Sequence, residues 1–158
     1  MSATIAKSST ADRELVITRI FNAPRKLVFE VFTDPKHVIH WWGPNGFTNT
    51  IHHMNVKPGG EWKLTMHGPD GTNYPNLITY KEVVNQERLV WWHGSGEEVD
   101  DSQFESTIIF EDEGKKTKLT MRMVFQTKEA KDFVVEKYGA LEGQKQTMAR
   151  LEDYLSKL

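Results

Sequence analysis

The sequence contains no cysteine among its 158 residues. This absence excludes disulfide bonds, metal sites built from thiolates, and a cysteine nucleophile. It also fits a reducing compartment, where disulfides are rare. Stability must therefore come from an apolar core. A chain of this length suits one domain, which buries roughly 70% of the surface exposed by the unfolded chain.

Long apolar runs and an excess of one charge are missing as well. No run approaches the ~20 apolar residues of a membrane-spanning helix, and residues 1–13 have no apolar core of the kind found in signal peptides. The formal net charge is -2, with both signs interspersed, so no basic face points to nucleic acid. We expect a cytoplasmic protein with no membrane span and no nucleic-acid partner.

The most regular pattern that is present lies in residues 140–158. Leu141, Met148, Leu151 and Leu155 recur at helical spacing, with Gln144 on the same line. The rest of the chain contains mostly short alternating segments. A curved antiparallel sheet needs an element that covers its apolar face, and this helix is the only long candidate. We expect the sheet to wrap around the helix, with any pocket between the two.

The remaining elements follow from alternation, turn residues and helix breakers. No strand is followed by a crossover helix of about ten residues, which argues against a parallel sheet. The predicted fold is α+β: a curved antiparallel sheet of about seven strands wrapped around the long C-terminal helix, with two short helices after the first strand. Residues 1–13 form a flexible N-terminal arm in this prediction, and residues 14–158 form a single domain. The expected strands are 14–22, 48–56, 61–67, 76–84, 88–93, 103–112 and 117–126; the expected helices are 24–33, 35–41, 127–138 and 140–158; and 94–102 is an acidic loop.

Several motifs together resemble those of a known superfamily. They include Ala23-Pro24-Arg25, Phe32-Thr33-Asp34-Pro35, Trp41-Trp42-Gly43-Pro44, Pro58-Gly59-Gly60-Glu61-Trp62 and the ending Arg150-Leu151 with Tyr154-Leu155. On these motifs residues 14–158 resemble the START-like superfamily (SRPBCC, Bet v-like, helix-grip), and within it the group related to the C-terminal domain of the activator of the heat-shock protein 90 ATPase. Asn55 and Lys57 depart from the Asp and Arg of many relatives.

The resemblance implies a helix-grip fold with a cavity at one end, between the sheet and the C-terminal helix. Relatives bind apolar or amphipathic small molecules, and some catalyse cyclisation or similar reactions on them. Such a resemblance indicates the fold more closely than the function.

The residues that suit the wall of such a cavity are mostly aromatic, thioether or uncharged polar side chains. Trp62 shares a strand face with Met66, the face assigned to the helix, and Gln144 would be a polar anchor in an apolar pocket. The same aromatic residues also suit plain core packing. Neighbouring Trp91 and Trp92 must point to opposite faces, and an outward tryptophan gives a reason for a homodimer. The predicted ligand-binding set is Trp41, Trp62, Met66, His93, Met121, Gln144 and Met148.

The six histidines give no metal site. His37 and His40 are three residues apart on a short helix and could reach one ion, but no HExxH motif or carboxylate at ligand spacing supports them. His93 ends an aromatic strand, where a buried imidazole could act as an acid or base. A hydrogen-bonded histidine at that place is the alternative. No cofactor is predicted.

The sequence therefore favours a protein that binds an apolar or amphipathic small molecule and has no enzymatic activity. A cyclase- or hydrolase-like enzyme that uses His93 or a carboxylate in the same cavity is the first alternative. A co-chaperone that contacts heat-shock protein 90 is the second, although activators of that kind use an extra N-terminal domain for which this chain has no room.

Overall fold

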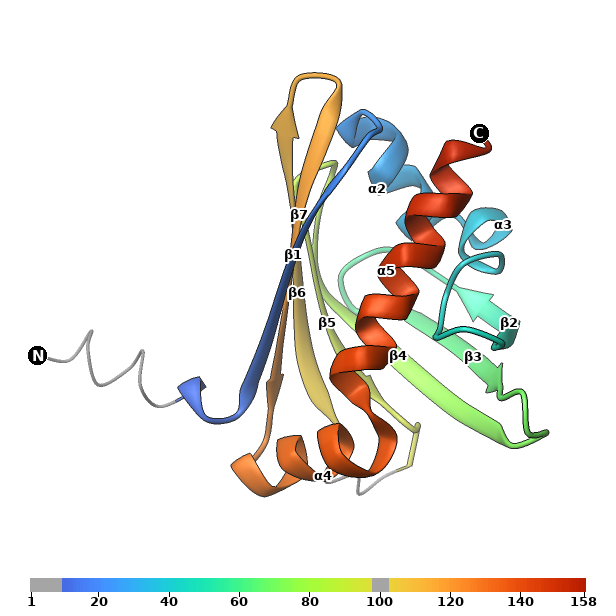
Figure 1. Ribbon diagram of the computed structural model, residues 1–158, viewed down its shortest axis with the longest axis vertical. Helices are drawn as coiled ribbons and strands as arrows, with labels where there is room; N and C mark the ends of the chain where they lie inside the picture. Colours follow the sequence, from blue (N-terminus) through green and yellow to red (C-terminus); the bar gives the residue numbers. More distant parts are fainter. Residues whose placement is uncertain (1–9, 98–102) are drawn as a thin grey trace, which may run out of the picture.

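Seven strands form one antiparallel sheet in the order β1-β7-β6-β5-β4-β3-β2 (Figure 1). The structure is a computed structural model that describes residues 10–97 and 103–158. Strands β2 to β7 pair consecutively, and β1 pairs with β7. The predicted α+β sheet is confirmed. Its strands are β1 (Glu14–Phe21), β2 (Thr48–Met54), β3 (Glu61–His67), β4 (Asn73–Val84), β5 (Arg88–Gly94), β6 (Phe104–Glu113) and β7 (Lys116–Phe125).

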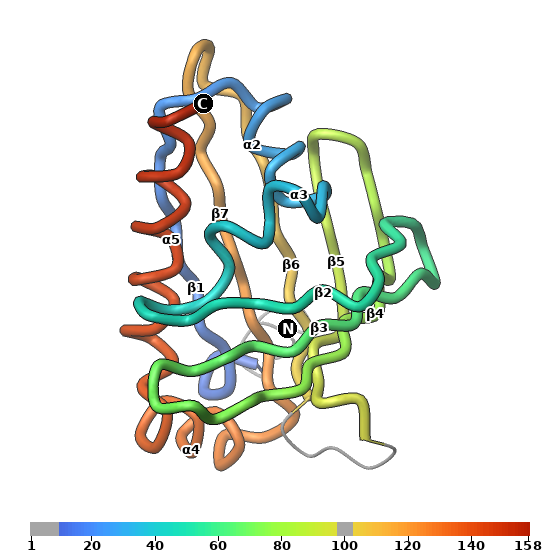
Figure 2. Tube along the Cα trace, turned by 90° about the vertical axis from the view of Figure 1, so that its right-hand side faces the viewer, coloured from blue at the N-terminus to red at the C-terminus, as the bar shows by residue number. Residues whose placement is uncertain are grey.

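Alternation of apolar and polar side chains makes one face of the sheet the core. Strand β7 shows this best, because every second residue from Thr117 to Phe125 is buried. Successive side chains on a strand point to opposite faces, so one regular pattern fixes the whole strand. Figure 2 shows β1, β7, β6 and β5 running along the long axis while β2 and β3 cross it. The sheet is therefore strongly twisted and curved, as expected.

Two short helices, α2 (Arg25–Thr33) and α3 (Pro35–Val38), connect β1 to β2. Pro24 is the N-cap of α2. Helix α2 ends at Thr33, because Asp34 precedes Pro35 and has an extended conformation. The Asp34 side chain then accepts a hydrogen bond from the backbone N–H of Lys36 at 2.9 Å and starts α3.

Helix α3 ends at Val38, earlier than the predicted Trp41. The backbone N–H groups of His40 and Trp41 bond carbonyls three residues earlier, which tightens the chain into turns. Trp41 is thereby directed into the core, where its indole Nε1 donates to the carbonyl of Val31 at 3.0 Å.

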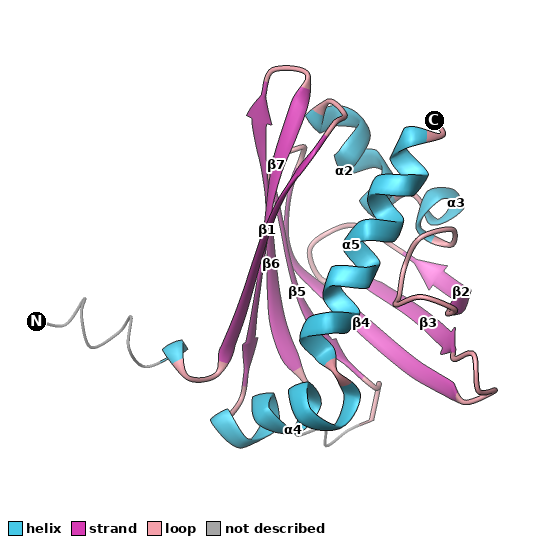
Figure 3. Ribbon diagram, in the orientation of Figure 1, coloured by secondary structure: helices cyan, strands magenta, loops and turns pink. Residues whose placement is uncertain are grey.

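Helix α5 (Ala140–Ser156) lies against the inner face of the sheet, as predicted (Figures 1 and 3). Its buried residues are Thr147, Met148, Leu151 and Leu155. The predicted place of Leu141 in the buried stripe is wrong, because this residue is 38% exposed. The first turn of α5 instead borders a cavity.

Helix α4 (Lys128–Tyr138) joins β7 to α5 and has no buried residue. The Thr127 hydroxyl accepts a hydrogen bond from the backbone N–H of Ala130 and caps α4. Gly139 separates α4 from α5 with a φ of 60°, a left-handed conformation that glycine adopts without steric cost. The predicted break at Tyr138-Gly139 is confirmed.

Strand β4 begins at Asn73, three residues before its predicted start. Pro75 made an earlier start unfavourable, because proline cannot donate to a ladder hydrogen bond. Pro75 pairs with Thr65 of β3, while pairing with β5 begins only at Leu77. On its β5 side, β4 is therefore unpaired at Pro75, and no ladder hydrogen bond requires an N–H from this residue.

Part of the predicted N-terminal arm and part of the predicted acidic loop lie outside the described residues. The described end of the arm is bonded to β7, since the Arg13 side chain donates to the carbonyl of Phe125 at 2.6 Å. Within residues 10–97 and 103–158, no helix has the length and apolar character needed to cross a membrane.

Candidate ligand-binding cavity

A cavity of about 140 Å³ lies between the inner face of the sheet and the first half of α5. It is bordered by three strands, by α5 and by the loop that precedes β2. Its lining residues are Trp42, Gly43, Pro44, Met66, His93, Met121, Tyr138, Ala140, Gly143, Gln144, Thr147 and Met148.

The strand wall is built from inward-facing positions. Met66 comes from β3, His93 from β5 and Met121 from β7. Met121 is 3% exposed, and the alternation of β7 explains its direction. From α5, Gln144, Thr147 and Met148 face the same space because residues three and four apart share one side of a helix.

The loop wall, residues 42–44, is held by hydrogen bonds from α5. One nitrogen of Arg150, Nη1, donates to the carbonyls of Gly43 at 2.8 Å and of Pro44 at 2.9 Å. The Asn49 side chain donates to the carbonyl of Trp42 at 2.8 Å. Partial burial lowers the pKa of Arg150. These contacts fix Trp42 at the cavity.

Gly43 lets this loop approach β3 closely. Its φ is +99°, and a Cβ placed there would lie 3.0 Å from the Met66 methyl group and 3.1 Å from Cβ of Phe47. The positive φ disfavours any residue other than glycine. A side chain at this position would also force Met66 and Phe47 to move.

Three polar side chains line the cavity on strand β5 and helix α5. Asn76 donates to the carbonyl of Tyr74 through Nδ2, which leaves its Oδ1 as the acceptor from His93 Nε2 at 2.6 Å. His93 therefore carries its proton on Nε2 in the neutral state. The Thr147 hydroxyl donates to the carbonyl of Gly143 at 2.9 Å. The half-buried Gln144 amide makes no hydrogen bond to any described residue.

The structure brings together five of the seven predicted residues. Met66, His93, Met121, Gln144 and Met148 all line the cavity. Trp41 and Trp62 are not among the lining residues, and both are buried core residues. Whether the cavity residues bind a ligand stays a prediction.

Trp42 lines the cavity as well, although it is not in the predicted ligand-binding set. The adjacent Trp41 and Trp42 could not be told apart at a helix end, because their directions depend on the tight turns after Val38. Trp42 covers Trp62, with ring centroids 4.7 Å apart, and so separates Trp62 from the cavity. Pro44, Gly143 and Thr147 also gave no local pattern that indicated a pocket.

The alternation between Trp91 and Trp92 was predicted and is confirmed. Trp91 is 1% exposed, whereas Trp92 is half-buried on the other face beneath Lys81, whose Nζ lies 4.9 Å from the ring centroid. A homodimer built on the outward tryptophan stays a prediction.

Behind the cavity, the tryptophan cluster holds polar atoms without partners. The indole nitrogens of Trp62 and Trp91 and the hydroxyl of Tyr80 are buried and have no hydrogen-bond partner among the described residues. Burial raises the pKa of Tyr80 well above its usual range. The phenol is thus neutral in the folded protein.

A larger groove of about 600 Å³ runs along α5 on the other side of Arg150. Its charged groups already have partners. Lys157 pairs with Asp153 at 2.9 Å, and Arg150 bonds the loop carbonyls. The smaller cavity, with its unbonded amide, is therefore the better candidate for a ligand.

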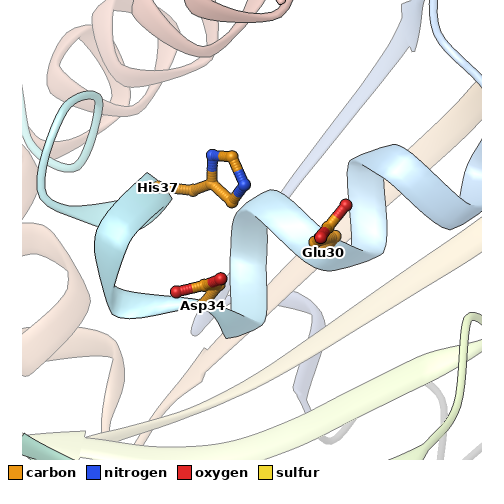
Figure 4. Close-up of side chains that lie close together, drawn as sticks. All are labelled: Glu30, Asp34 and His37. Atoms are coloured by element: carbon orange, nitrogen blue, oxygen red, sulfur yellow. The ribbon is translucent and has the colours of Figure 1, made fainter.

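A second cluster joins α2, the α2–α3 junction and α3 (Figure 4). The ligand-type atoms of Glu30, Asp34 and His37 lie within 4.8 Å of one another. The expectation that no carboxylate lies at ligand spacing from His37 is wrong, because the junction folds Asp34 and Glu30 back toward this histidine.

Structural contacts account for two of the three residues, Asp34 and His37. Asp34 caps α3, and His37 Nδ1 lies 2.7 Å from the hydroxyl of Tyr154 on α5. His40 stacks on the same tyrosine ring, with centroids 5.6 Å apart. The three-residue spacing of His37 and His40 thus brings both to Tyr154. Partial burial, and after it the charge of Asp34, raises the pKa of Tyr154.

Comparison with known proteins identifies the family of this chain. Residues 22–156 match the family model described as Activator of Hsp90 ATPase homolog 1-like protein. The chain belongs to this family. The match covers the helix-grip elements from the end of β1 to the end of α5, and so includes the whole cavity.

Solved structures of low sequence identity share the fold of this Hsp90-activator-like chain. A solution structure from Arthrobacter aurescens aligns with a TM-score of 0.86 at 23% identity, covering 94% of this chain and 89% of the other. A crystal structure from Mycobacterium smegmatis gives 0.83 at 22% identity, covering 92% of each. The AHSA1 protein from Silicibacter pomeroyi gives 0.72 at 17% identity, covering 90% and 97%. No curated protein matches the sequence.

Proposed function

We propose that this protein binds an apolar or weakly amphipathic small molecule in the cavity between the sheet and α5. The observation that carries the proposal is the lining, which combines an apolar wall with the Gln144 side chain, whose amide bonds no described residue. Binding sites for small molecules commonly have this composition, with a few polar groups that fix orientation. Met66, Met121 and Met148 suit an adaptable wall, because thioethers fill irregular space.

An enzyme that uses His93 is the weaker proposal. The described lining residues include no carboxylate that could act with His93 as a second acid or base. The hydrogen bond to Asn76 supports a role of His93 in shaping the wall. Contact with a chaperone stays an expectation from the family resemblance.

The proposal predicts ligand-dependent stability that depends on the cavity. Thermal unfolding of the protein would be measured across a panel of hydrophobic compounds, together with native mass spectrometry of the purified protein. A compound at a hundred times its Kd should raise the free energy of unfolding by about 2.7 kcal/mol. Gly143→Leu, which places a side chain in the cavity, should remove this rise.

The matched control is Lys145→Leu, which adds the same side chain at an exposed position of the same helix. It should keep the response of the wild type. A response that survives in Gly143→Leu would place the ligand elsewhere, and the absence of any response in the wild type would overturn the proposal.

A further inference from the structure

The size of the cavity limits its ligand. A dry apolar cavity of about 150 Å³ holds one benzene molecule, whereas pockets for drug-sized ligands measure roughly 300–1,000 Å³. The cavity here measures about 140 Å³. Trp42 closes it toward the core, because this residue is 7% exposed and packs on Trp62. The space therefore fits one ring, and a small substituent can lie at the mouth because the cavity is partly open to solvent.

The lining selects against charge and in favour of a flat ring. The described lining residues include no Asp, Glu, Lys or Arg. A charged ligand would lose its hydration without gaining an opposite charge. The rings of Trp42 and His93 border the space with centroids 6.3 Å apart. Methionine sulfur atoms make favourable contacts with aromatic ring edges, and three methionines line this cavity.

Gln144 supplies the anchor. Its amide both donates and accepts hydrogen bonds, lines the cavity, and has no hydrogen bond to a described residue. A hydroxyl or carboxamide group on the ligand can both accept a hydrogen bond from the amide and donate one to it. A ligand without such a group would bury the amide unpaired, which is unfavourable.

Gly143 also supports a cavity that is kept open for a ligand. Glycine is among the least favourable residues inside a helix, and Gly143 lies in the first turns of α5. A Cβ at this position would meet only Pro44, at an ordinary contact distance of 3.4 Å. Packing therefore does not require glycine here, and the missing side chain keeps the cavity open.

We propose that the cavity takes an uncharged ligand with one aromatic ring that carries a hydroxyl or carboxamide group, and that the Gln144 amide binds this group. The inference rests on the proposed function and narrows the class of ligand. It assigns Gln144 as the residue that discriminates between ligands, while the methionines and Trp42 hold the ring.

Isothermal titration with four probes tests the inference: 4-methylphenol, toluene, 2-naphthol and dodecanoic acid. 4-Methylphenol and toluene differ only in the hydroxyl group. The ratio of their affinities should fall about threefold to tenfold in Gln144→Met, which keeps the length of the side chain and removes the amide. 2-Naphthol and dodecanoic acid, which exceed the cavity, should bind the wild type more weakly than 4-methylphenol.

The outcomes separate the two proposals. Tighter binding of 2-naphthol or dodecanoic acid, abolished by Gly143→Leu, would overturn the one-ring inference and keep the proposed function. An affinity ratio unchanged in Gln144→Met would overturn the role of Gln144. If no probe bound the wild type and the wider panel also gave no response, both proposals would fail.

Discussion

At the scale of single residues, the polar groups of the cavity and of the core behind it differ in whether a ligand can reach them. The Gln144 amide borders open space, whereas Tyr80 places its hydroxyl in the packed core, 1% exposed. A buried polar group without a partner costs free energy that an apolar side chain of the same shape does not. The buried Tyr80 hydroxyl therefore lowers the stability of the fold, whereas the Gln144 amide can form its hydrogen bonds with a ligand.

Tyr80→Phe tests this reading of the core. Removing an unpartnered hydroxyl should raise the free energy of unfolding at pH 7 by about 1 kcal/mol. Tyr80 keeps its proton in the folded state, whereas in the unfolded chain it ionises near pH 10. The folded state then holds more protons above pH 10, so the wild type loses stability there as pH rises.

The measurement is urea unfolding of both proteins at pH 7 and pH 11. The advantage of Tyr80→Phe should be larger at pH 11, because the variant lacks this ionisation. A variant less stable than the wild type at pH 7 would show that the hydroxyl has a bonding partner in the folded protein.

At the scale of elements, the cavity depends on how α5 holds the loop before β2. Arg150 and Gln146 of α5 bond the loop at Gly43, Pro44 and Asn45. The sheet supplies the opposite wall through strands fixed by pairing. The loop wall has no such ladder, so its position relies on these few side-chain hydrogen bonds.

Arg150→Met should loosen this wall. Hydrogen bonds from a charged group contribute about 1.5–3 kcal/mol, and methionine preserves much of the apolar stem. We expect a fall of about 1–3 kcal/mol in the free energy of unfolding, with faster hydrogen exchange at residues 42–45. Lys145→Met, on the exposed side of α5, is the control and should change neither. Unchanged exchange in Arg150→Met would show that Asn49 and Gln146 hold the loop without Arg150.

At the scale of the whole molecule, sheet and helix share one core. Met148, Leu151 and Leu155 of α5 belong to the same buried cluster as the inner residues of the strands. The ion pair between Arg19 of β1 and Glu152 of α5, at 2.7 Å, lies on the exposed side of this contact. Exposed pairs contribute little, so apolar burial holds the helix on the sheet.

Two substitutions one residue apart compare these contributions. Leu151→Ala removes a fully buried side chain and should lower the free energy of unfolding by about 2–5 kcal/mol. Glu152→Ala should lower it by less than about 1 kcal/mol, and less again in high salt. Chemical denaturation followed by tryptophan fluorescence and by circular dichroism measures both. Similar losses in the two variants would contradict the dominance of apolar burial.

The sequence alone determined the elements of this protein, because each rests on a local cause. Alternation set the faces of β3 and β7, Pro35 ended α2, and Gly139 separated the last two helices. The same alternation placed Met66 and Met121 on the inner face, and the helical period placed Gln144 and Met148 opposite them.

Only the tertiary structure decided which residues border open space and which are packed. Trp41 and Trp42 are neighbours with the same chemistry, and the tight turns after Val38 direct the first into the core and the second to the cavity. Trp62 faces inward as its strand requires, yet Trp42 covers it. A cavity and a packed core use the same types of residue, so the difference depends on the distances between elements, and no local pattern encodes those distances.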